Sequence, residues 1–322
     1  MNSLINNQKI CLKEFVPSRV ICKNVPEKSF ELNINEDELY LSLSYITELH
    51  NWKGLVGEKH YSLLLPKQIG RNQETFEVLG LLQAEMGKQH DGKISFCNHE
   101  YKLINKVLEW FSEEFNFSKD KWKWYIKVNI NEPIDEDYRR EIENKVISFW
   151  IDKTNLTLER SYPKKVSFIK NTKNTELKSD DYGTLIIEVG SNLFSQIIKN
   201  FVKTMTQNMV DFGRSEVKHF MRGIIAGESC VEIHIPSKKY RIHISANDKD
   251  EKLIYHNCLK KLGINSIIYK HDKLVISRRE NNLSLLKDGL MNLSPEKYEK
   301  FLIMMNLYAD FDITDIPKED SN

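Results

Sequence analysis

The feature that most constrains the fold of this chain is a sequence pattern that occurs twice. Each copy is a helix-like run with two small residues four positions apart and a glutamate directly after the second one. The copies are TFEVLGLLQAEMGK, with Gly80, Ala84 and Glu85, and VKHFMRGIIAGESC, with Gly223, Gly227 and Glu228. Residues four apart lie on one face of a helix, so small residues there allow a partner helix to approach closely. We therefore predict that the two helices pack against each other around a pseudo-twofold axis.

The segments downstream of the two copies are also similar, which favours an internal repeat. The spacing of apolar residues predicts a strand, an amphipathic helix and further strands in both cases. They occupy residues 93–99, 100–115 and 122–130 after the first copy, and residues 242–248, 252–264 and 266–279 after the second. Asn72 and Ser215 are the expected N-caps of the two motif helices. The chain is thus expected to have an α+β fold with two related halves.

The predicted organisation has three parts. Residues 1–70 carry short apolar runs and are expected to form an N-terminal extension or a small subdomain. Residues 71–213 are expected to form the first half, with a helical insertion near 133–150, and residues 214–322 the second half.

The two glutamates of the repeat are candidates for a metal site. If the helices pack as predicted, Glu85 and Glu228 meet at the end of the helix interface. Two carboxylates at such a separation repel each other unless one is protonated or a cation neutralises them. A hard divalent cation such as Mg²⁺, which takes oxygen ligands, meets that need and can activate water for an in-line displacement at phosphorus. The alternative for either motif alone is a buried helix whose glutamate lies at an exposed end, but two matching copies favour the site.

At these residues the chain resembles the LAGLIDADG family of homing endonucleases in its monomeric, two-motif form. The stretches LGLLQAEMG (79–87) and MRGIIAGES (221–229) carry the glycine, the second small residue and the metal-binding acid of the family motif. They differ from it at Gln83 and Ala226, which precede the second small residue and replace the usual acid. The resemblance extends downstream over most of residues 72–310.

The resemblance implies a fold and a function. The implied fold is α+β, with two pseudo-twofold-related αββαββα half-domains whose antiparallel sheets form a DNA-binding saddle, in a monomer that clamps double-stranded DNA. The implied function is that of a site-specific DNA endonuclease that hydrolyses phosphodiester bonds with Mg²⁺ (or Mn²⁺) as cofactor. Glu85 and Glu228 are the implied catalytic and metal-binding residues, with Ala84 and Gly227 as further metal ligands.

A catalytically silent relative, which serves as a DNA-binding regulator or an RNA maturase, is the alternative. The retained pair of glutamates favours the enzyme, whereas the net charge of only +1 and the irregular first half favour the binding protein. Lys203 and Lys297 are candidates for the basic residues that the family commonly places near its active centre.

Basic residues gather in two stretches of the sequence, near residues 160–178 and 236–279. Strands rich in basic residues are expected to contact phosphates and bases, although a solvated charged face is the plainer interpretation of such runs. The candidate DNA contacts are Lys164, Lys165, Lys170, Lys173, Lys238, Lys239, Arg241, Lys270, Lys273, Arg278 and Arg279. His234 and His243 are expected to be surface or groove contacts rather than metal ligands. Trp122 and Trp124 share one strand face and are expected to belong to the core.

Composition excludes several other classes of protein. The hydrophobic share of 40% and the charged share of 29% are those of a soluble globular protein. No window is apolar enough to span a membrane and the N-terminus lacks the pattern of a signal peptide, so a cytoplasmic location is expected. The five cysteines form no CxxC pair, which predicts buried or free thiols. A metabolic enzyme is disfavoured because the chain has no Gly-rich phosphate loop and no nucleophile motif.

Overall fold

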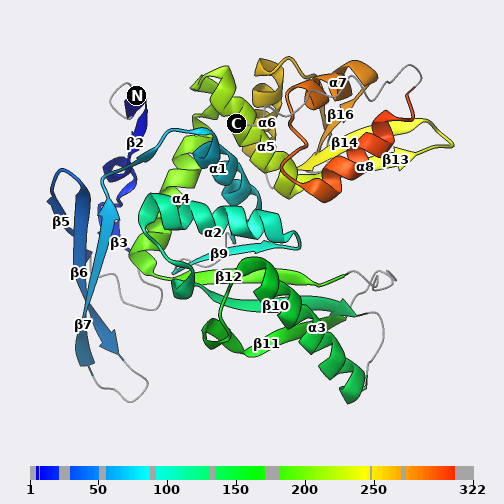
Figure 1. Cartoon of the computed structure of the whole chain (residues 1–322). Coiled ribbons are helices and arrows are strands. Elements are labelled where there is room, and N and C mark those ends of the chain that lie inside the picture. Colours follow the sequence, from blue (N-terminus) through cyan, green and yellow to red (C-terminus); the bar gives the residue numbers. More distant parts are fainter. Residues whose placement is uncertain are drawn as a thin grey trace. The chain divides into compact units, whose positions relative to one another are not determined.

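The chain forms two compact units in a computed structural model (Figure 1). The structure describes residues 5–6, 8–21, 30–50, 56–87, 92–130, 135–170, 181–246, 249–269 and 273–308. The first unit comprises residues 1–71 and 86–201, and the second comprises residues 72–85 and 202–322. Both motif helices therefore belong to the second unit. The fold is mixed α+β, as predicted, with eight α-helices and five sheets in the described residues.

The N-terminal part of the first unit consists of short strands and one long hairpin. A three-stranded sheet is formed by β1 (Ile5–Asn6), β2 (Lys9–Cys11) and β8 (Gln68–Gly70), and a small pair by β3 (Arg19–Val20) and β4 (Phe30–Glu31). The hairpin is formed by β6 (Tyr40–His50) and β7 (Val56–Pro66), with β5 (Asn33–Glu36) beside β6. The two strands are paired along their whole length, from Tyr40 opposite Pro66 to His50 opposite Val56. Tyr45 stacks on Tyr61 with ring centroids 4.9 Å apart.

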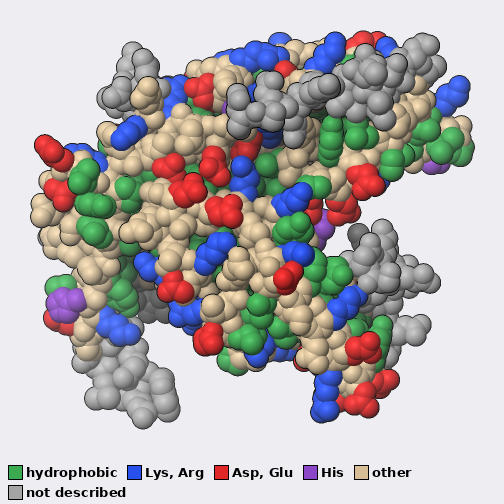
Figure 2. Space-filling model, viewed as in Figure 1, with side chains coloured by type: hydrophobic (Ala, Val, Ile, Leu, Met, Phe, Trp, Pro, Cys, Tyr) green, Lys and Arg blue, Asp and Glu red, His purple; other side chains and the backbone are tan. Residues whose placement is uncertain are grey.

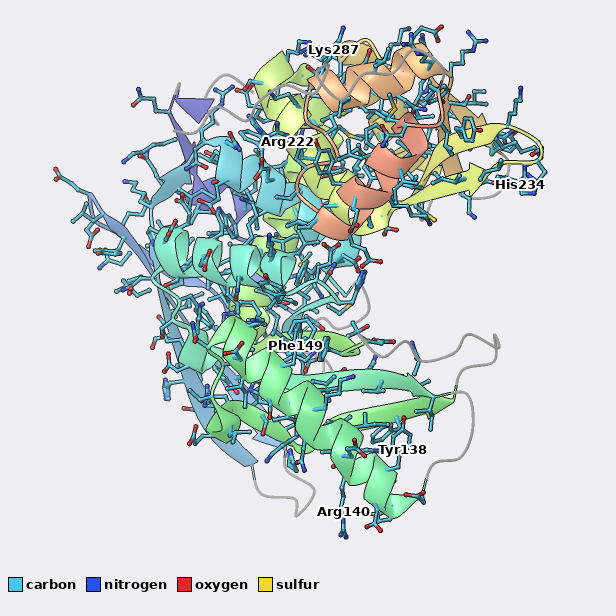
Figure 3. All side chains as sticks on the ribbon, turned by 45° about the vertical axis from the view of Figure 1, so that its right-hand side comes forward. Tyr138, Arg140, Phe149, Arg222, His234 and Lys287 are labelled. Carbon is cyan, nitrogen blue, oxygen red and sulfur yellow. The ribbon has the colours of Figure 1, made fainter. Side chains whose placement is uncertain are left out.

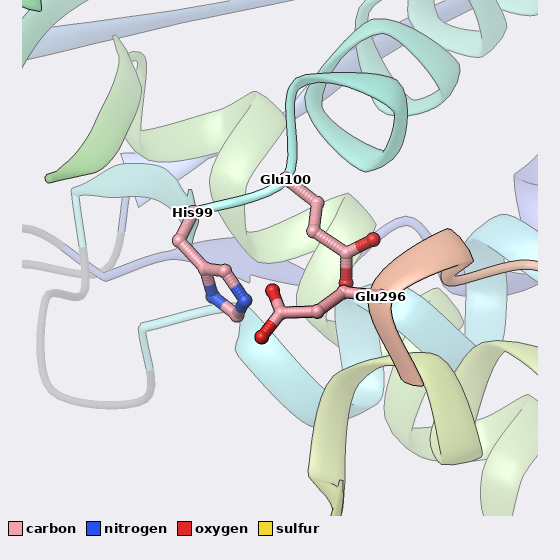
Figure 4. Close-up of side chains that lie close together, drawn as sticks. All are labelled: His99, Glu100 and Glu296. Atoms are coloured by element: carbon pink, nitrogen blue, oxygen red, sulfur yellow. The ribbon is translucent and has the colours of Figure 1, made fainter. Parts of the chain in front are cut away.

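A four-stranded sheet forms the rest of the first unit, in the order β11-β10-β12-β9. Its strands are β9 (Lys93–Asn98), β10 (Lys123–Ile130), β11 (Ser161–Lys170) and β12 (Thr184–Gly190). They are accompanied by α2 (Tyr101–Phe115), α3 (Glu136–Thr154) and the beginning of α4 (Asn192–Gln207). Glu100 directly precedes α2 (Figure 4), and its main-chain N–H donates to the side chain of Asn98.

This sheet differs from the predicted antiparallel one. The strands β10 and β11 are parallel, whereas β10–β12 and β12–β9 are antiparallel. A parallel pair needs a long crossover, and α3, which is the helical insertion predicted near 133–150, provides it. Asp135 caps α3 by accepting the N–H of Tyr138 at 2.8 Å. Among the described residues, β9 is the one strand between α1 and α2, so the first repeat does not have the order αββαββα.

The core of the first unit lies between this sheet and its helices. Trp122 is 0% exposed and Trp124 is 1% exposed, which confirms their predicted core role. The indole N–H of Trp124 donates to the main-chain oxygen of Thr157 at 2.8 Å. Phe111 packs edge-on against Trp122 and Phe194. Burial of aromatic rings this large is the main source of stability for such a layer.

The second unit follows the predicted element order more closely. Its second-repeat elements are α5 (Arg214–Glu228), β13 (Ser229–His234), β14 (Lys239–Ser245), α6 (Lys249–Lys261), β15 (Ser266–Tyr269), β16 (Lys273–Ser277), α7 (Arg279–Lys287) and α8 (Pro295–Met305). The order αββαββα therefore runs from α5 to α7. The sheet order is β13-β14-β16-β15, and every pairing in it is antiparallel.

The first motif helix, α1 (Gln73–Glu85), completes this unit. Asn72 caps it as predicted, because its side-chain oxygen accepts the N–H of Thr75 at 2.8 Å. The predicted cap at Ser215 is wrong: α5 begins earlier, with Gly213 as N-cap and Ser215 inside the first turn. Glycine is tolerated at an N-cap, so the helix does not need a side-chain cap there.

Two further predictions can be compared with the fold. The described cysteines, Cys11, Cys97, Cys230 and Cys258, are free thiols, as predicted. None of the described helices is both long and apolar enough to cross a membrane.

Candidate active site and nucleic-acid interface

The two motif helices lie against each other at their glycines. A Cβ added to Gly80 would overlap the main-chain oxygen of Phe220 and lie 2.9 Å from the Cα of Gly223. A Cβ added to Gly223 would overlap the main-chain oxygen of Glu77 and lie 2.8 Å from the Cα of Gly80. The backbones are in direct contact, so neither position has room for a side chain. Glycine at these two positions is therefore a requirement of the helix pairing.

The helices also meet one turn later, next to the two glutamates. A Cβ added to Gly227 would overlap the Cβ of Ala84 and lie 3.2 Å from the Cγ of Glu85. Glu85 is the last residue of α1, and Glu228 is the last residue of α5. Both are half-buried. The Glu85 side chain thus lies next to the space beside Gly227, the residue before Glu228, and both carboxylates belong to the C-terminal ends of paired helices.

A lysine from α8 binds the C-terminal end of α5. The Lys297 ammonium donates to the main-chain oxygens of Ile225 at 3.4 Å, of Gly227 at 2.9 Å and of Ala226. Lys297 lies in the first turn of α8, whose N-cap Ser294 accepts the Lys297 N–H at 3.3 Å. Ser294 is 1% exposed, so this cap is buried. It fixes the start of α8 and thereby the position from which the Lys297 side chain extends. The other lysine candidate, Lys203, is exposed on α4.

Polar side chains from α4 and α6 surround the end of α1. The Gln83 amide donates to Glu251 at 3.0 Å and accepts the hydroxyl proton of Thr206 at 3.2 Å. Tyr255 is 1% exposed, and burial raises its pKa well above the usual value for a phenol, with the negative charges of Glu251 and Glu228 acting in the same direction. The phenol is therefore neutral at ordinary pH, and it stands within electrostatic reach of Glu228.

A buried ion pair joins the two motif helices at the level of their glycines. Glu77 of α1 is 2% exposed, and its carboxylate lies 3.3 Å from the Arg222 guanidinium and 3.4 Å from His219. Arg222, labelled on α5 in Figure 3, also donates to the main-chain oxygen of Asp288 at 3.2 Å. Since a buried carboxylate is costly without a partner, this pair fixes the register of α1 on α5.

The sheet of the second unit has a buried apolar face and an opposite face that carries most of its polar side chains. Along β14, Ile242 and Ile244 are buried, while the intervening residues and Lys239 are more exposed. The register pairs Arg241 with Glu232 and with Ser277, and pairs Ser245 with Lys273, so these residues share the polar face. His243 on this face bonds Glu232 through Nε2 at 2.6 Å, and this bond holds the pKa of Glu232 below its usual value. His234 is exposed at the end of β13, as labelled in Figure 3.

The sheet of the first unit has a comparable polar face, which was not among the predicted contacts. The Lys93 ammonium lies 3.1 Å from the Glu188 carboxylate, which also accepts the Tyr162 hydroxyl proton at 2.6 Å. Lys93 and Lys123 each lie 5.6 Å from the centroid of the Tyr162 ring, and Lys127 lies 5.9 Å from that of Tyr125. The alternation in KWYIKVNI, with buried residues between exposed lysines, was the signal that could have identified them.

The predicted DNA contacts occupy several settings. Lys164 and Lys165 belong to β11, Lys239 and Arg241 to β14, and Lys273 to β16, while Lys238 occupies the turn before β14 with a φ of 48°. Lys173, Lys270 and the side chain of Lys170 lie outside the described residues. Arg278 directly follows β16, which ends at Ser277, and Arg279 is the first residue of α7. The surface that is in view in Figure 2 shows charges of both signs interspersed, in keeping with the net charge of +1.

The residues at the motif ends provide the donors that a hard divalent cation prefers. Glu85 and Glu228 could contribute carboxylates, and Ala84 and Gly227 could contribute main-chain oxygens at the negative ends of the helix dipoles. An all-oxygen set of this kind fits Mg²⁺ or Mn²⁺. The main-chain oxygen of Gly227, however, already accepts a hydrogen bond from Lys297.

Comparison with known proteins finds LAGLIDADG domains among the similar solved structures. No protein-family model matches this sequence, and no curated protein matches it. The structure is similar to the crystal structure of the N-terminal LAGLIDADG domain of DUF199/WhiA, with 13% identity, a TM-score of 0.34, and coverage of 74% of this chain and 84% of that one. Full-length DUF199/WhiA from Thermatoga maritima matches with 13% identity and a TM-score of 0.37, over 76% of this chain and 64% of that one.

A homing endonuclease is also among the similar structures. I-DmoI in complex with DNA and Ca matches with 16% identity and a TM-score of 0.32, over 71% of this chain and 96% of that one. At these identities the similarity concerns the fold alone.

Proposed function

We propose that the chain is a site-specific endonuclease for double-stranded DNA, in which Glu85 and Glu228 hold Mg²⁺ or Mn²⁺. The observation that carries this proposal is the close approach of Ala84 and Glu85 to Gly227, the residue before Glu228, at the end of two glycine-paired helices. Two motifs far apart in the sequence are thereby brought to one place. The pairing supplies two carboxylates where a divalent cation can neutralise them.

Each part of the candidate site has a distinct task in this proposal. The carboxylates of Glu85 and Glu228, with the main-chain oxygen of Ala84, would hold the cation. When bound, the cation supplies charge stabilisation and an activated water for in-line attack on a phosphodiester. Gly80 and Gly223 fix the helix pairing, and the Glu77–Arg222 pair sets its register.

The polar sheet faces are the proposed DNA-binding surfaces. In the second unit this surface contains Lys239, Arg241 and Lys273, and in the first unit it contains Lys93, Lys123 and Lys127. Lysine and arginine on open strands neutralise phosphates and release counterions, which makes binding sensitive to salt. Strands in the major groove also read base edges, which would provide site specificity.

The experiment that tests the proposed function separates binding from cutting. The full chain is incubated with a library of duplex DNA at several salt concentrations, with Mg²⁺, with Mn²⁺ or with EDTA, and bound and cleaved molecules are sequenced. Metal-dependent cuts at a limited set of sequences are expected, together with binding that weakens as salt increases. Absence of duplex DNA binding at low salt would refute the proposal.

Opposite charge changes on one sheet face should have opposite effects. We expect Arg241→Gln to weaken DNA binding and to reduce the slope of log K against the logarithm of the salt concentration by about one. We expect Glu232→Gln, on the paired position of β13, to strengthen binding because it removes the opposing carboxylate from the same face. The measurement is a titration of labelled duplex DNA at four salt concentrations. Equal effects of both changes would contradict the assignment of this face to DNA.

The second candidate function is a DNA-binding regulator that does not cut. One observation favours it: Lys297 donates a hydrogen bond to the main-chain oxygen of Gly227, which would otherwise be available to a cation. Sequence-selective binding without cleavage under Mg²⁺ or Mn²⁺ is the result expected of a regulator.

A further inference from the structure

The second motif ends in a setting that already contains a positive charge. The ammonium of Lys297 carries three N–H donors, and the main-chain oxygens of Ile225, Ala226 and Gly227 accept from it. These carbonyls form the negative end of the α5 dipole, which is the place where a cation gains most from a helix. Lys297 is half-buried, and the buried cap at Ser294 fixes the start of its helix. The ammonium is therefore held in place by the fold.

We propose that Lys297 is a built-in counter-cation of the second motif, which competes with a divalent cation for the end of α5. If the main-chain oxygen of Gly227 accepted a hydrogen bond from the ammonium and also coordinated a divalent cation, the two positive charges would lie only a few ångströms apart and would repel each other. The cation is then held more weakly at the α5 end than the donor set alone would allow. This inference rests on the proposed function, since it concerns the cation that Glu85 and Glu228 would hold.

The end of the second motif therefore carries a positive charge from the protein itself. The lysine comes from α8, which lies beyond the strands and helices of the second repeat. The α5 end is compensated by the protein itself, and Glu228 has a positive group near its own main chain before any metal binds. A divalent cation that binds there must therefore overcome the repulsion of the ammonium.

Removing the charge at residue 297 should therefore strengthen divalent binding. The full chain, without DNA, is titrated with Mn²⁺ alone, and free Mn²⁺ is measured by electron paramagnetic resonance. We expect Lys297→Met and Lys297→Gln to bind Mn²⁺ roughly tenfold more tightly than the unaltered chain, because a unit charge about 5 Å from a divalent ion is removed. Lys297→Arg retains a cation and is expected to resemble the unaltered chain. Adding Glu228→Gln should abolish the gain.

A purely structural role of Lys297 predicts a different pattern. In that case Lys297→Met and Lys297→Gln lower the melting temperature but leave the Mn²⁺ affinity unchanged, and this result would overturn the inference. Lys297→Gln keeps an N–H donor for the carbonyls, so it covers the case in which Lys297→Met does not fold. A gain that persists in the double variant with Glu228→Gln would place the ion elsewhere and would also overturn it.

Failure of the proposed function can be recognised separately. If Mn²⁺ binding depends on Glu85 and Glu228 but not on the charge at residue 297, the inference fails and the metal site stands. If none of the variants binds Mn²⁺, both the metal site and the inference fail. If Mn²⁺ binding rises as expected but duplex DNA is not bound, Lys297 still acts as the counter-cation and the nuclease assignment fails.

Discussion

Replacing Glu228 with glutamine is expected to reduce metal-dependent DNA cleavage by more than about 100-fold. Loss of a group that only supports a metal ligand already costs about 10–100-fold, and a direct ligand should cost more. Glutamine has nearly the same shape but lacks the charge that would bind the cation. DNA affinity should be unchanged or slightly higher, because a negative charge is removed from a surface that would face phosphates. Cleavage and binding are measured on the same selected duplex.

The matching change at Glu85 and a neutral control complete this test. Glu85→Gln should have an effect of similar size, because Glu85 ends the paired helix and lies close to Gly227. Glu299→Gln removes an exposed carboxylate from α8 and should leave cleavage unaffected. If both motif variants cleave within about tenfold of the unaltered chain, the glutamates are not the metal ligands. If both lose DNA binding as well, their role is structural.

The most local sequence signals predicted the fold best. Amphipathic spacing identified α2 and α6, and the polar side chain of Asn72 identified the start of α1. These features depend on a few neighbouring residues. Ser215 was wrong as a cap because the N-cap of α5 is Gly213, which has no side chain that would mark the start of the helix in the sequence.

Long-range features were harder to predict. The parallel pairing of β10 with β11 depends on the path that α3 takes, and strand alternation alone does not specify a partner. Lys93 and Tyr162 lie far apart in the sequence, and only the sheet register brings them together at Glu188. At the motif end, Lys297 was predictable only as a candidate basic residue, because nothing near it in sequence indicates that it binds α5.

The glycine pairing of the motif helices was predictable because it leaves a direct trace in the sequence. A close backbone contact requires a glycine on the contacting helix face, and each copy of the pattern has one, Gly80 or Gly223, with the small residue Ala84 or Gly227 four positions later. The chemistry at the helix ends has no comparable trace. Polar groups from α4, α6 and α8 reach these ends, and each comes from a different stretch of the chain.

Gly223→Ala should destabilise the second unit by more than about 3 kcal/mol, the upper end of the usual cost of overpacking. The added methyl group would overlap the main-chain oxygen of Glu77 and lie 2.7 Å from the amide nitrogen of Leu81, and neither atom can move without the helix. In an open helix the same change would instead stabilise by about 1 kcal/mol, because alanine favours helices over glycine. The sign of the effect therefore reports the helix contact. Urea unfolding, followed by circular dichroism, measures it.

A second pair of variants distinguishes contact with a side chain from contact with a backbone. Gly227→Ala would overlap the Cβ of Ala84, a group that can itself be removed. We expect Gly227→Ala to destabilise the unit and Ala84→Gly to recover part of the loss in the double variant, as coupled neighbours do. Gly190→Ala, with nothing within 4 Å of the new Cβ, should change stability by less than about 0.5 kcal/mol. Strictly additive effects at residues 84 and 227 would mean that the helices do not touch next to the glutamates, and the metal site would then lose its geometric basis.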